Sequence, residues 1–281
     1  MYKINNIKNN DDVNILAEKG PFTVVEYEKD LSVTPQTAMI AFFCEEMNVK
    51  KRQLICDLKK AEITTQAGAM QWSAGNVYAS TGVKGVGDFF SKTFRGKVSG
   101  ESAIKPEYKG NGTLVLEPTY KHIVLMDTEE WGGAVVLDDG LFLACDSRLK
   151  HETVMRRNLS SAIAGGEGLF NLCLSGKGVF AIESVCPREE LVEIYLEDDI
   201  LKVDGNFAIA WSKGLEFTVE RSGKTLVGSA ASGEGLVNVY RGTGKVLLAP
   251  VNKTIKGFPS FPFQQPAPER KPRSINFTFK R

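Results

Sequence analysis

The side chains that most often carry catalysis or bind metals are sparse in this sequence. Its 281 residues include two histidines, His122 and His151, which form no HxH or HxxxH pattern. The five cysteines, an odd number with no CxxC pair, are Cys44, Cys56, Cys145, Cys173 and Cys186. Because a protein metal centre needs several ligands at matched spacings, we expect no metal site, and each histidine is typical of a surface or core residue.

Nucleophile and nucleotide motifs are incomplete. There is no GxSxG elbow for a serine nucleophile. Gly223-Lys224-Thr225 matches the end of a P-loop, but position 218 holds Thr where the motif requires Gly. Gly82, Gly85 and Gly87 do not form GxGxxG. We therefore expect no catalytic residue and no cofactor, although a hydrolase or lyase with a dispersed site stays open.

Composition and cysteine usage indicate a globular protein in a reducing compartment. Hydrophobic residues make up 42% and charged residues 25% of the chain, a balance that argues against wholesale disorder. The net charge of +1 gives no global attraction for nucleic acid. Scattered cysteines favour reduced thiols. The polar N-terminus has no signal-peptide pattern, and the longest apolar run, 38–44, is too short to span a bilayer. We expect a cytoplasmic protein.

A repeat of glycines organises the chain. Three GxG pairs lie 66 residues apart: Gly110 and Gly112, Gly176 and Gly178, Gly242 and Gly244. Each pair precedes alternating apolar residues: Leu114 and Leu116, Phe180 and Ile182, Val246 and Leu248. Period two next to glycine predicts a strand that follows a turn of positive φ. We predict equivalent strands at 110–118, 176–184 and 242–250.

Two further columns keep the same phase. A Gly-Glu pair precedes each GxG: Gly100 and Glu101, Gly166 and Glu167, Gly233 and Glu234. Earlier turn glycines are Gly75, Gly140 and Gly205. The repeat units are therefore 62–118, 119–184 and 185–250. An N-terminal segment, 1–61, is expected to pair with the first unit, and a basic Pro-rich tail follows at 251–281.

The repeat predicts an all-β domain. A unit of this size is marginal alone, so the three units should pack into one body with approximate threefold symmetry. We expect Leu114, Phe180 and Val246 to face a shared interior. Outside the repeat, the runs 22–27 and 38–44 are expected to be strands that pair with the first unit, and 86–94 a short helix.

Three segments, 68–81, 166–184 and 233–250, resemble the altered inheritance of mitochondria protein 24 family, which is grouped with the tryptophan RNA-binding attenuation protein, TRAP. The resemblance implies three TRAP-like double-stranded β-helix units with internal pseudo-threefold symmetry. Mitochondrial members are associated with inner-membrane organisation, and bacterial members lack an assigned activity. Family likeness alone is an associational guide to function.

The Gly-Glu turns have two interpretations. Glu101, Glu167 and Glu234 could converge near the threefold axis and bind a cation. Alternatively, each carboxylate accepts backbone N–H bonds within its own turn. Repetition in every unit favours the structural role. We predict that Glu167→Gln keeps the fold and loses no metal.

Two basic segments are candidate contacts for a polyanion: Lys50, Lys51 and Arg52, and Arg270, Lys271 and Arg273. From residue 252 the chain carries seven basic residues against one acid, a net +6 that leaves −5 for the remainder. The tail is expected to contact a protein partner or a membrane surface, or to fold back over its own body with 257–273 extended and 275–279 paired at a sheet edge. We do not expect nucleic acid as a partner.

These observations favour a non-enzymatic binding or scaffold protein. We expect a homo-oligomer, because exposed sheet edges favour further pairing. The alternative is a small-molecule- or RNA-binding regulator in the manner of TRAP.

Overall fold

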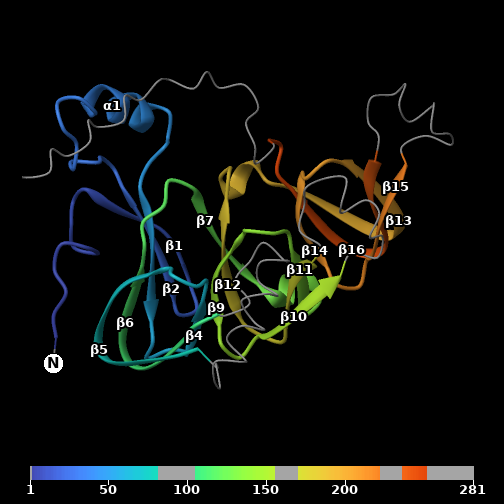
Figure 1. Ribbon diagram of the computed structural model, residues 1–281, viewed down its shortest axis with the longest axis horizontal. Coiled ribbons are helices and arrows are strands. Elements are labelled where there is room, and N and C mark those ends of the chain that lie inside the picture. The colour runs from blue at the N-terminus through green and yellow to red at the C-terminus, as the bar shows by residue number, and fades with distance from the viewer. Residues whose placement is uncertain (1, 82–104, 156–169, 222–235, 252–281) are drawn as a thin grey trace, which may run out of the picture.

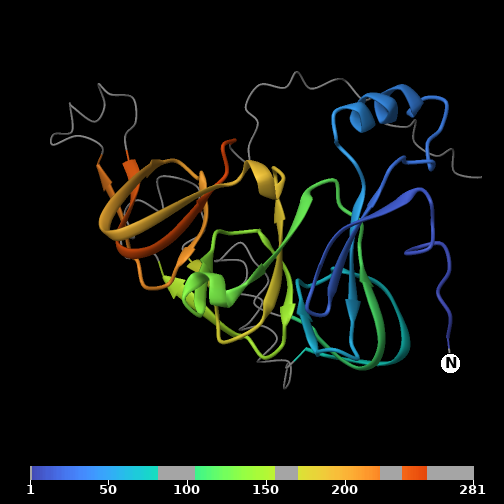
Figure 2. The same ribbon diagram turned by 180° about the vertical axis from the view of Figure 1, so that it is seen from behind.

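Two antiparallel β-sheets and one α-helix make up the fold, in a computed structural model that describes residues 2–81, 105–155, 170–221 and 236–251. Figure 1 shows the sheets side by side, with α1 (Ala38–Glu46) above the upper end of the first sheet in this view. The reverse view in Figure 2 shows the same arrangement. The all-β fold class is confirmed.

The first sheet follows the order β1-β2-β3-β6-β4-β9-β12-β7, and β5 pairs with β6 outside that path. Its strands are β1 (Val13–Lys19), β2 (Phe22–Tyr27), β3 (Arg52–Asp57), β4 (Ile63–Thr65), β5 (Met70–Ser80), β6 (Glu107–Leu116), β7 (His122–Asp127), β9 (Phe142–Asp146) and β12 (Val179–Ser184). The predicted strand at 22–27 is confirmed as β2, but it pairs with β1 and β3 rather than with the first unit. The N-terminal segment joins the first unit through β3, where Ile55 lies opposite Val115.

The second sheet follows the order β10-β11-β8-β14-β16-β13, and β15 pairs with β16. Its strands are β8 (Ala134–Leu137), β10 (Lys150–Met155), β11 (Phe170–Ser175), β13 (Val192–Asp204), β14 (Ala208–Ser212), β15 (Glu216–Arg221) and β16 (Leu236–Leu248). Two short 3₁₀ helices, η1 (Thr128–Trp131) and η2 (Arg188–Glu190), follow β7 and β12.

Strands of neighbouring repeat units pair with each other within each sheet. In the first sheet β4 of unit 62–118 pairs with β9 of unit 119–184. In the second sheet β8 of unit 119–184 pairs with β14 of unit 185–250. The middle unit therefore contributes to both sheets, and backbone hydrogen bonds join each unit to the next.

The predicted strands at 110–118, 176–184 and 242–250 are confirmed by β6, β12 and β16. Leu114, Phe180 and Val246 are each fully buried. However, they belong to three different hydrophobic clusters, so the packing does not show the shared interior that we expected. Period-two patterning identifies a buried face but not which core that face joins.

The run 38–44 is helical, and the expectation of a strand there is wrong. Strands β2 and β3 pair directly with each other, with Phe22 opposite Cys56. The residues between them therefore leave the sheet, where no ladder is open to them. Ala38, Met39 and Ala41 have high helix propensity, and local hydrogen bonds form α1 instead.

The GxG pairs are not simple turns between strands. Only Gly176 and Gly178 lie between two strands, β11 and β12. The pairs in β6 and β16 lie inside continuous strands. The first glycine nevertheless has the positive φ expected of it in every unit, at 118° in Gly110, 114° in Gly176 and 111° in Gly242.

Several predictions concern residues outside the described part of the chain. These are the Gly-Glu pairs at 100–101, 166–167 and 233–234, the helix at 86–94, the tail strap at 257–273, the tail strand at 275–279, and Arg270, Lys271 and Arg273.

Candidate functional site

Helix α1 and its flanks carry eight large apolar residues that are exposed. We call this set the α1 surface; its members are Leu31, Val33, Met39, Ile40, Phe42, Phe43, Met47 and Val49. No residue of the helix is buried, and Met39 and Phe43 are 72% and 60% exposed. At about 200 Å² for a large side chain, these residues offer roughly 800 Å² of apolar area. A patch of that size on a soluble domain marks an interaction site.

Hydrogen bonds centred on Asp30 attach α1 and its flanks to the rest of the protein. The Asp30 backbone N–H donates to Glu45 Oε1 at 2.8 Å, which joins the segment before the helix to its last turn. The Asp30 carboxylate accepts hydrogen bonds from Lys51 Nζ at 3.0 Å and from the Tyr120 hydroxyl at 2.8 Å. Burial raises the pKa of Asp30, but these bonds outweigh it, so its pKa lies below the usual value. Both ends of the segment are therefore fixed to the body.

Arg52 anchors the chain as it returns from α1 to the sheet. Its side chain is 1% exposed, and Nη2 lies 2.6 Å from Glu26 Oε2. The guanidinium also donates to the carbonyl oxygens of Asn48, Lys50 and Tyr120. It thus ties the segment after α1 to β2 and to the chain beyond β6.

The predicted polyanion contact at 50–52 is largely engaged within the protein. Lys50 Nζ lies 3.7 Å from Glu26, and Lys51 pairs with Asp30 and lies over the Tyr27 ring. Arg52 is buried. The structure gives these residues a role in supporting α1, and binding of a polyanion by the two lysines stays a prediction.

At several of the GxG positions, neighbouring atoms lie so close to the backbone that a side chain would clash with them. A Cβ on Gly110 would lie 2.1 Å from the Asn76 carbonyl oxygen, and one on Gly112 would lie 2.3 Å from that of Ala74. At Gly244 the nearest atom is Ser212 Cβ, at 2.9 Å. At Gly178 the contact is looser, with Asp146 Cβ at 3.2 Å. Close approach therefore accounts for glycine at 110, 112 and 244, and a structural role for all six GxG glycines stays a prediction.

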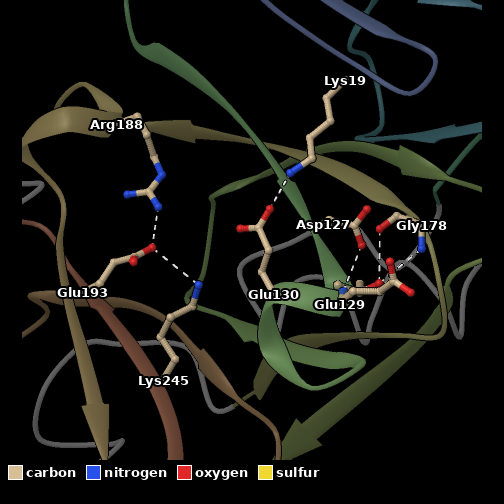
Figure 3. Close-up of polar contacts among 9 residues, drawn as sticks. Lys19, Asp127, Glu129, Glu130, Gly178, Arg188, Glu193 and Lys245 are labelled. Carbon is tan, nitrogen blue, oxygen red and sulfur yellow. Dashed lines mark hydrogen bonds and ion pairs between the residues drawn. The ribbon is translucent and has the colours of Figure 1, made fainter.

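A charged cluster joins the last unit to the middle one (Figure 3). Lys245, with a side chain 6% exposed, places Nζ 4.2 Å from the centroid of the Trp131 ring and 3.4 Å from Glu193 Oε1. Arg188 binds the same carboxylate. Both cations share Glu193, so the cluster holds β13 and β16 to η1. Trp131 is itself buried.

The other contacts in Figure 3 also centre on η1. Lys19 at the end of β1 pairs with Glu130, which connects the edge of the first sheet to this helix. The Thr128 hydroxyl donates to the Gly176 carbonyl at 2.8 Å and accepts from the Gly178 N–H at 3.2 Å. Backbone bonds from the Thr128 N–H to the Gly178 carbonyl and from the Gly176 N–H to the Gly133 carbonyl complete the attachment of the middle GxG to η1 and its C-terminal flank.

Two cavities lie between residues 4–9 and the first sheet. One of about 350 Å³ has a floor of Ile55, Val115 and Trp72, with Lys8 and Lys60 among its lining residues. A second of about 310 Å³ also reaches Trp72. These volumes suit a small ligand, and the lining suits a molecule with a flat apolar part and an anionic group.

His151 forms a polar pair with a buried thiol. Its Nε2 lies 3.1 Å from Cys145 Sγ, and its ring packs edge-on against Phe142. Burial, together with a smaller effect of the nearby Lys105 charge, lowers the pKa of His151 to about 4. Burial raises the pKa of the Cys145 thiol far above its usual value, so it stays protonated. This pair is packing, not an activated nucleophile.

This pair makes stability depend on pH. The folded His151 has a pKa of about 4 against 6.5 for the ordinary group, so the unfolded chain takes up the proton first as pH falls. We expect the free energy of unfolding to drop by about 2 kcal/mol between pH 7.5 and 5 through this residue. Urea unfolding at the two pH values measures it. His151→Gln should reduce the pH-dependent loss by that amount, and an equal loss in both proteins would contradict the assignment.

Residues 2–81, 105–155, 170–221 and 236–251 contain no group of three or more His, Cys, Asp or Glu side chains placed to hold a metal ion. Among the same residues, no helix has the length and apolarity that crossing a bilayer requires.

Sequence reasoning missed α1 as a surface. Its signal was present, because 38–44 is the longest apolar run and lies between two strand-forming segments. Reading that run as a strand assigned it to the core. The buried ion pair of Arg52 left a weaker signal, a single arginine at the start of the apolar run of β3.

Together these features define a predominantly β protein of two curled sheets, fixed by a glycine repeat and carrying an exposed apolar helix. Residues 46–251 match the family profile "Mitochondrial biogenesis AIM24", and the chain belongs to the AIM24 family. The resemblance found in the sequence is confirmed. Most of α1 precedes the matched region.

Relatives occur in Streptococcus pyogenes. Uncharacterized protein M6_Spy0233 of serotype M6 is 30% identical over 195 residues, which are 66% of this chain and 76% of that protein. The crystal structure of protein SPYM3_0169 has a TM-score of 0.53 and 27% identity, covering 72% of this chain and 89% of that one.

Proposed function

We propose that this protein is a non-enzymatic binding or scaffold protein that docks a protein partner through the α1 surface. One observation carries the proposal: eight large apolar residues are exposed together on a segment whose ends are fixed by Asp30 and Arg52. A helix that is apolar on all sides is normally surrounded by other groups. Holding it away from its own core leaves it free to dock.

Three further elements complete the proposal. The protein acts as a homo-oligomer in the cytoplasm, which agrees with five cysteines that form no disulfide. Its body is built from three TRAP-like double-stranded β-helix units with pseudo-threefold symmetry, which the recurring φ of the first GxG glycine supports. The basic tail contributes a second contact, with a protein or a membrane surface.

Native mass spectrometry of the full chain, purified from the cells that make it, tests the docking surface. We expect a complex heavier than the 30.8 kDa chain, and we expect Phe42→Ser with Phe43→Ser to lose it. Ile200→Ser, which changes a half-exposed residue of β13, is the matched control and should keep the complex. A complex that survives the double variant would contradict the proposal.

A small-molecule-binding regulator is the second candidate, because two cavities meet at Trp72. The same spectra would then show a retained mass of a few hundred daltons on the isolated chain. Trp72→Ala should abolish that mass and leave the α1-dependent complex unchanged. RNA binding, the other form of this alternative, would depend on Lys50, Lys51 and the tail.

A further inference from the structure

We infer that α1 packs antiparallel against α1 of a second copy of this chain, about a twofold axis near Phe42. The inference rests on the proposed function, since it names the partner of the same surface. Two features of α1 support it: the charges at the ends of the helix and the exposed apolar side chains between them.

The charges at the two ends of α1 are the reverse of what an isolated helix prefers. A helix carries partial positive charge at its N-terminus and partial negative charge at its C-terminus. The first turn of α1 has no acidic residue, and Thr37 at the N-cap makes no capping hydrogen bond with its side chain. The last turn has no basic residue and instead contains Glu45 and Glu46. The Glu45 carboxylate is bonded to the Asp30 N–H, so the charge that opposes the dipole and is left over at the C-terminal end is that of Glu46.

An antiparallel copy supplies the missing charge complement. The twofold axis places Glu46 of each helix beside the N-terminal end of the other, which has no acidic residue and no side-chain cap of its own. A parallel arrangement would bring Glu45 and Glu46 of the two copies together. A bilayer would accept the apolar side chains but would leave both helix ends without a counter-charge.

The apolar area also matches a dimer. The α1 surface offers roughly 800 Å², about what each partner buries in an interface of standard size. The nine residues of α1 are about 13 Å long, so side chains from the flanks, such as Leu31 and Met47, must complete the contact. Both flanks are exposed.

Sedimentation equilibrium of the full chain is the first experiment. We expect a dimer of 30.8 kDa subunits, and we expect Phe43→Asp to raise the dissociation constant about 30-fold or more. Glu46→Lys, which places a cation beside the partner's N-terminus, should weaken the dimer by a smaller factor. Ile200→Asp is the control and should leave it unchanged. Since no residue of α1 is buried, far-UV circular dichroism should be the same in all four proteins.

Cysteine crosslinking tests the orientation. In a Cys44→Ser background, Phe42→Cys at the middle of the helix should give a disulfide-linked dimer. Glu46→Cys should not react with its own copy, but it should react with Ala38→Cys when the two variants are mixed. Efficient self-linking at position 46 would overturn the antiparallel arrangement.

The two proposals fail in different ways. A chain that remains monomeric at high concentration, or a Phe43→Asp variant that still dimerises, would overturn the self-association. If the monomeric chain still loses a different protein partner when Phe42 and Phe43 are changed, the proposed docking function stands and only the second copy is wrong.

Discussion

Replacing Arg52 by methionine should lower the free energy of unfolding by about 3–5 kcal/mol, because it removes the nearer of the two cations beside a buried carboxylate. Glu26 is buried, and its closest cation is the Arg52 guanidinium at 2.6 Å. The variant also removes the donors to the carbonyls of Asn48 and Lys50, so the segment after α1 should loosen. Urea unfolding followed by tryptophan fluorescence measures the loss.

Two further variants separate the causes. Lys51→Met removes a more exposed ion pair with Asp30 and should cost about 1 kcal/mol or less. Arg52→Met combined with Glu26→Gln removes both charges and should recover part of the loss. If the double variant is no more stable than Arg52→Met, the charge of the buried carboxylate is not the source of the effect.

Gly110→Ala should produce the largest loss, enough to prevent folding or to cost more than about 4 kcal/mol. Its φ is +118°, and its Cβ would lie 2.1 Å from a backbone oxygen that β5 holds in place. Backbone carbonyls in a paired strand cannot move aside as a flexible side chain does. Soluble yield and thermal unfolding report the result.

The repeat provides matched controls for this prediction. Gly176 occupies the same repeat position with φ +114°, but the nearest atom to its Cβ would be 3.7 Å away. Gly68 has φ +78° and nothing within 4 Å. Alanine at either site should cost only the strain of positive φ, about 1–3 kcal/mol. Equal losses of stability for Gly110→Ala and Gly176→Ala would show that positive φ, rather than close approach of a backbone oxygen, determines the cost of the substitution.

The sequence allowed the strands and their glycines to be predicted, because both depend on local chemistry. Alternation marked β6, β12 and β16, and the spacing of glycines marked residues of positive φ such as Gly110 and Gly242. The close approach that also requires Gly110 depends on the pairing of β5 with β6, and a pattern along one strand does not report its partner.

The candidate site was harder to predict, because exposure is a property of the whole fold. The residues 38–44 are as apolar as a core strand, and only the direct pairing of β2 with β3 excludes them from the sheet. The role of Arg52 likewise depends on Glu26, which is 26 residues away in sequence and opposite it in the ladder. Charge runs read along the chain placed Arg52 on the surface.

The pairing of β2 with β3 does not depend on the exposed segment that connects them. The ladder closes at Glu26 opposite Arg52, with a further bond from the Tyr27 N–H to the Lys51 carbonyl. The residues between are an insertion at a hairpin end, where changes in length leave the sheet intact. The length and sequence of residues 28–51 can therefore change while β2 and β3 stay paired, so this exposed segment and the sheet can vary independently.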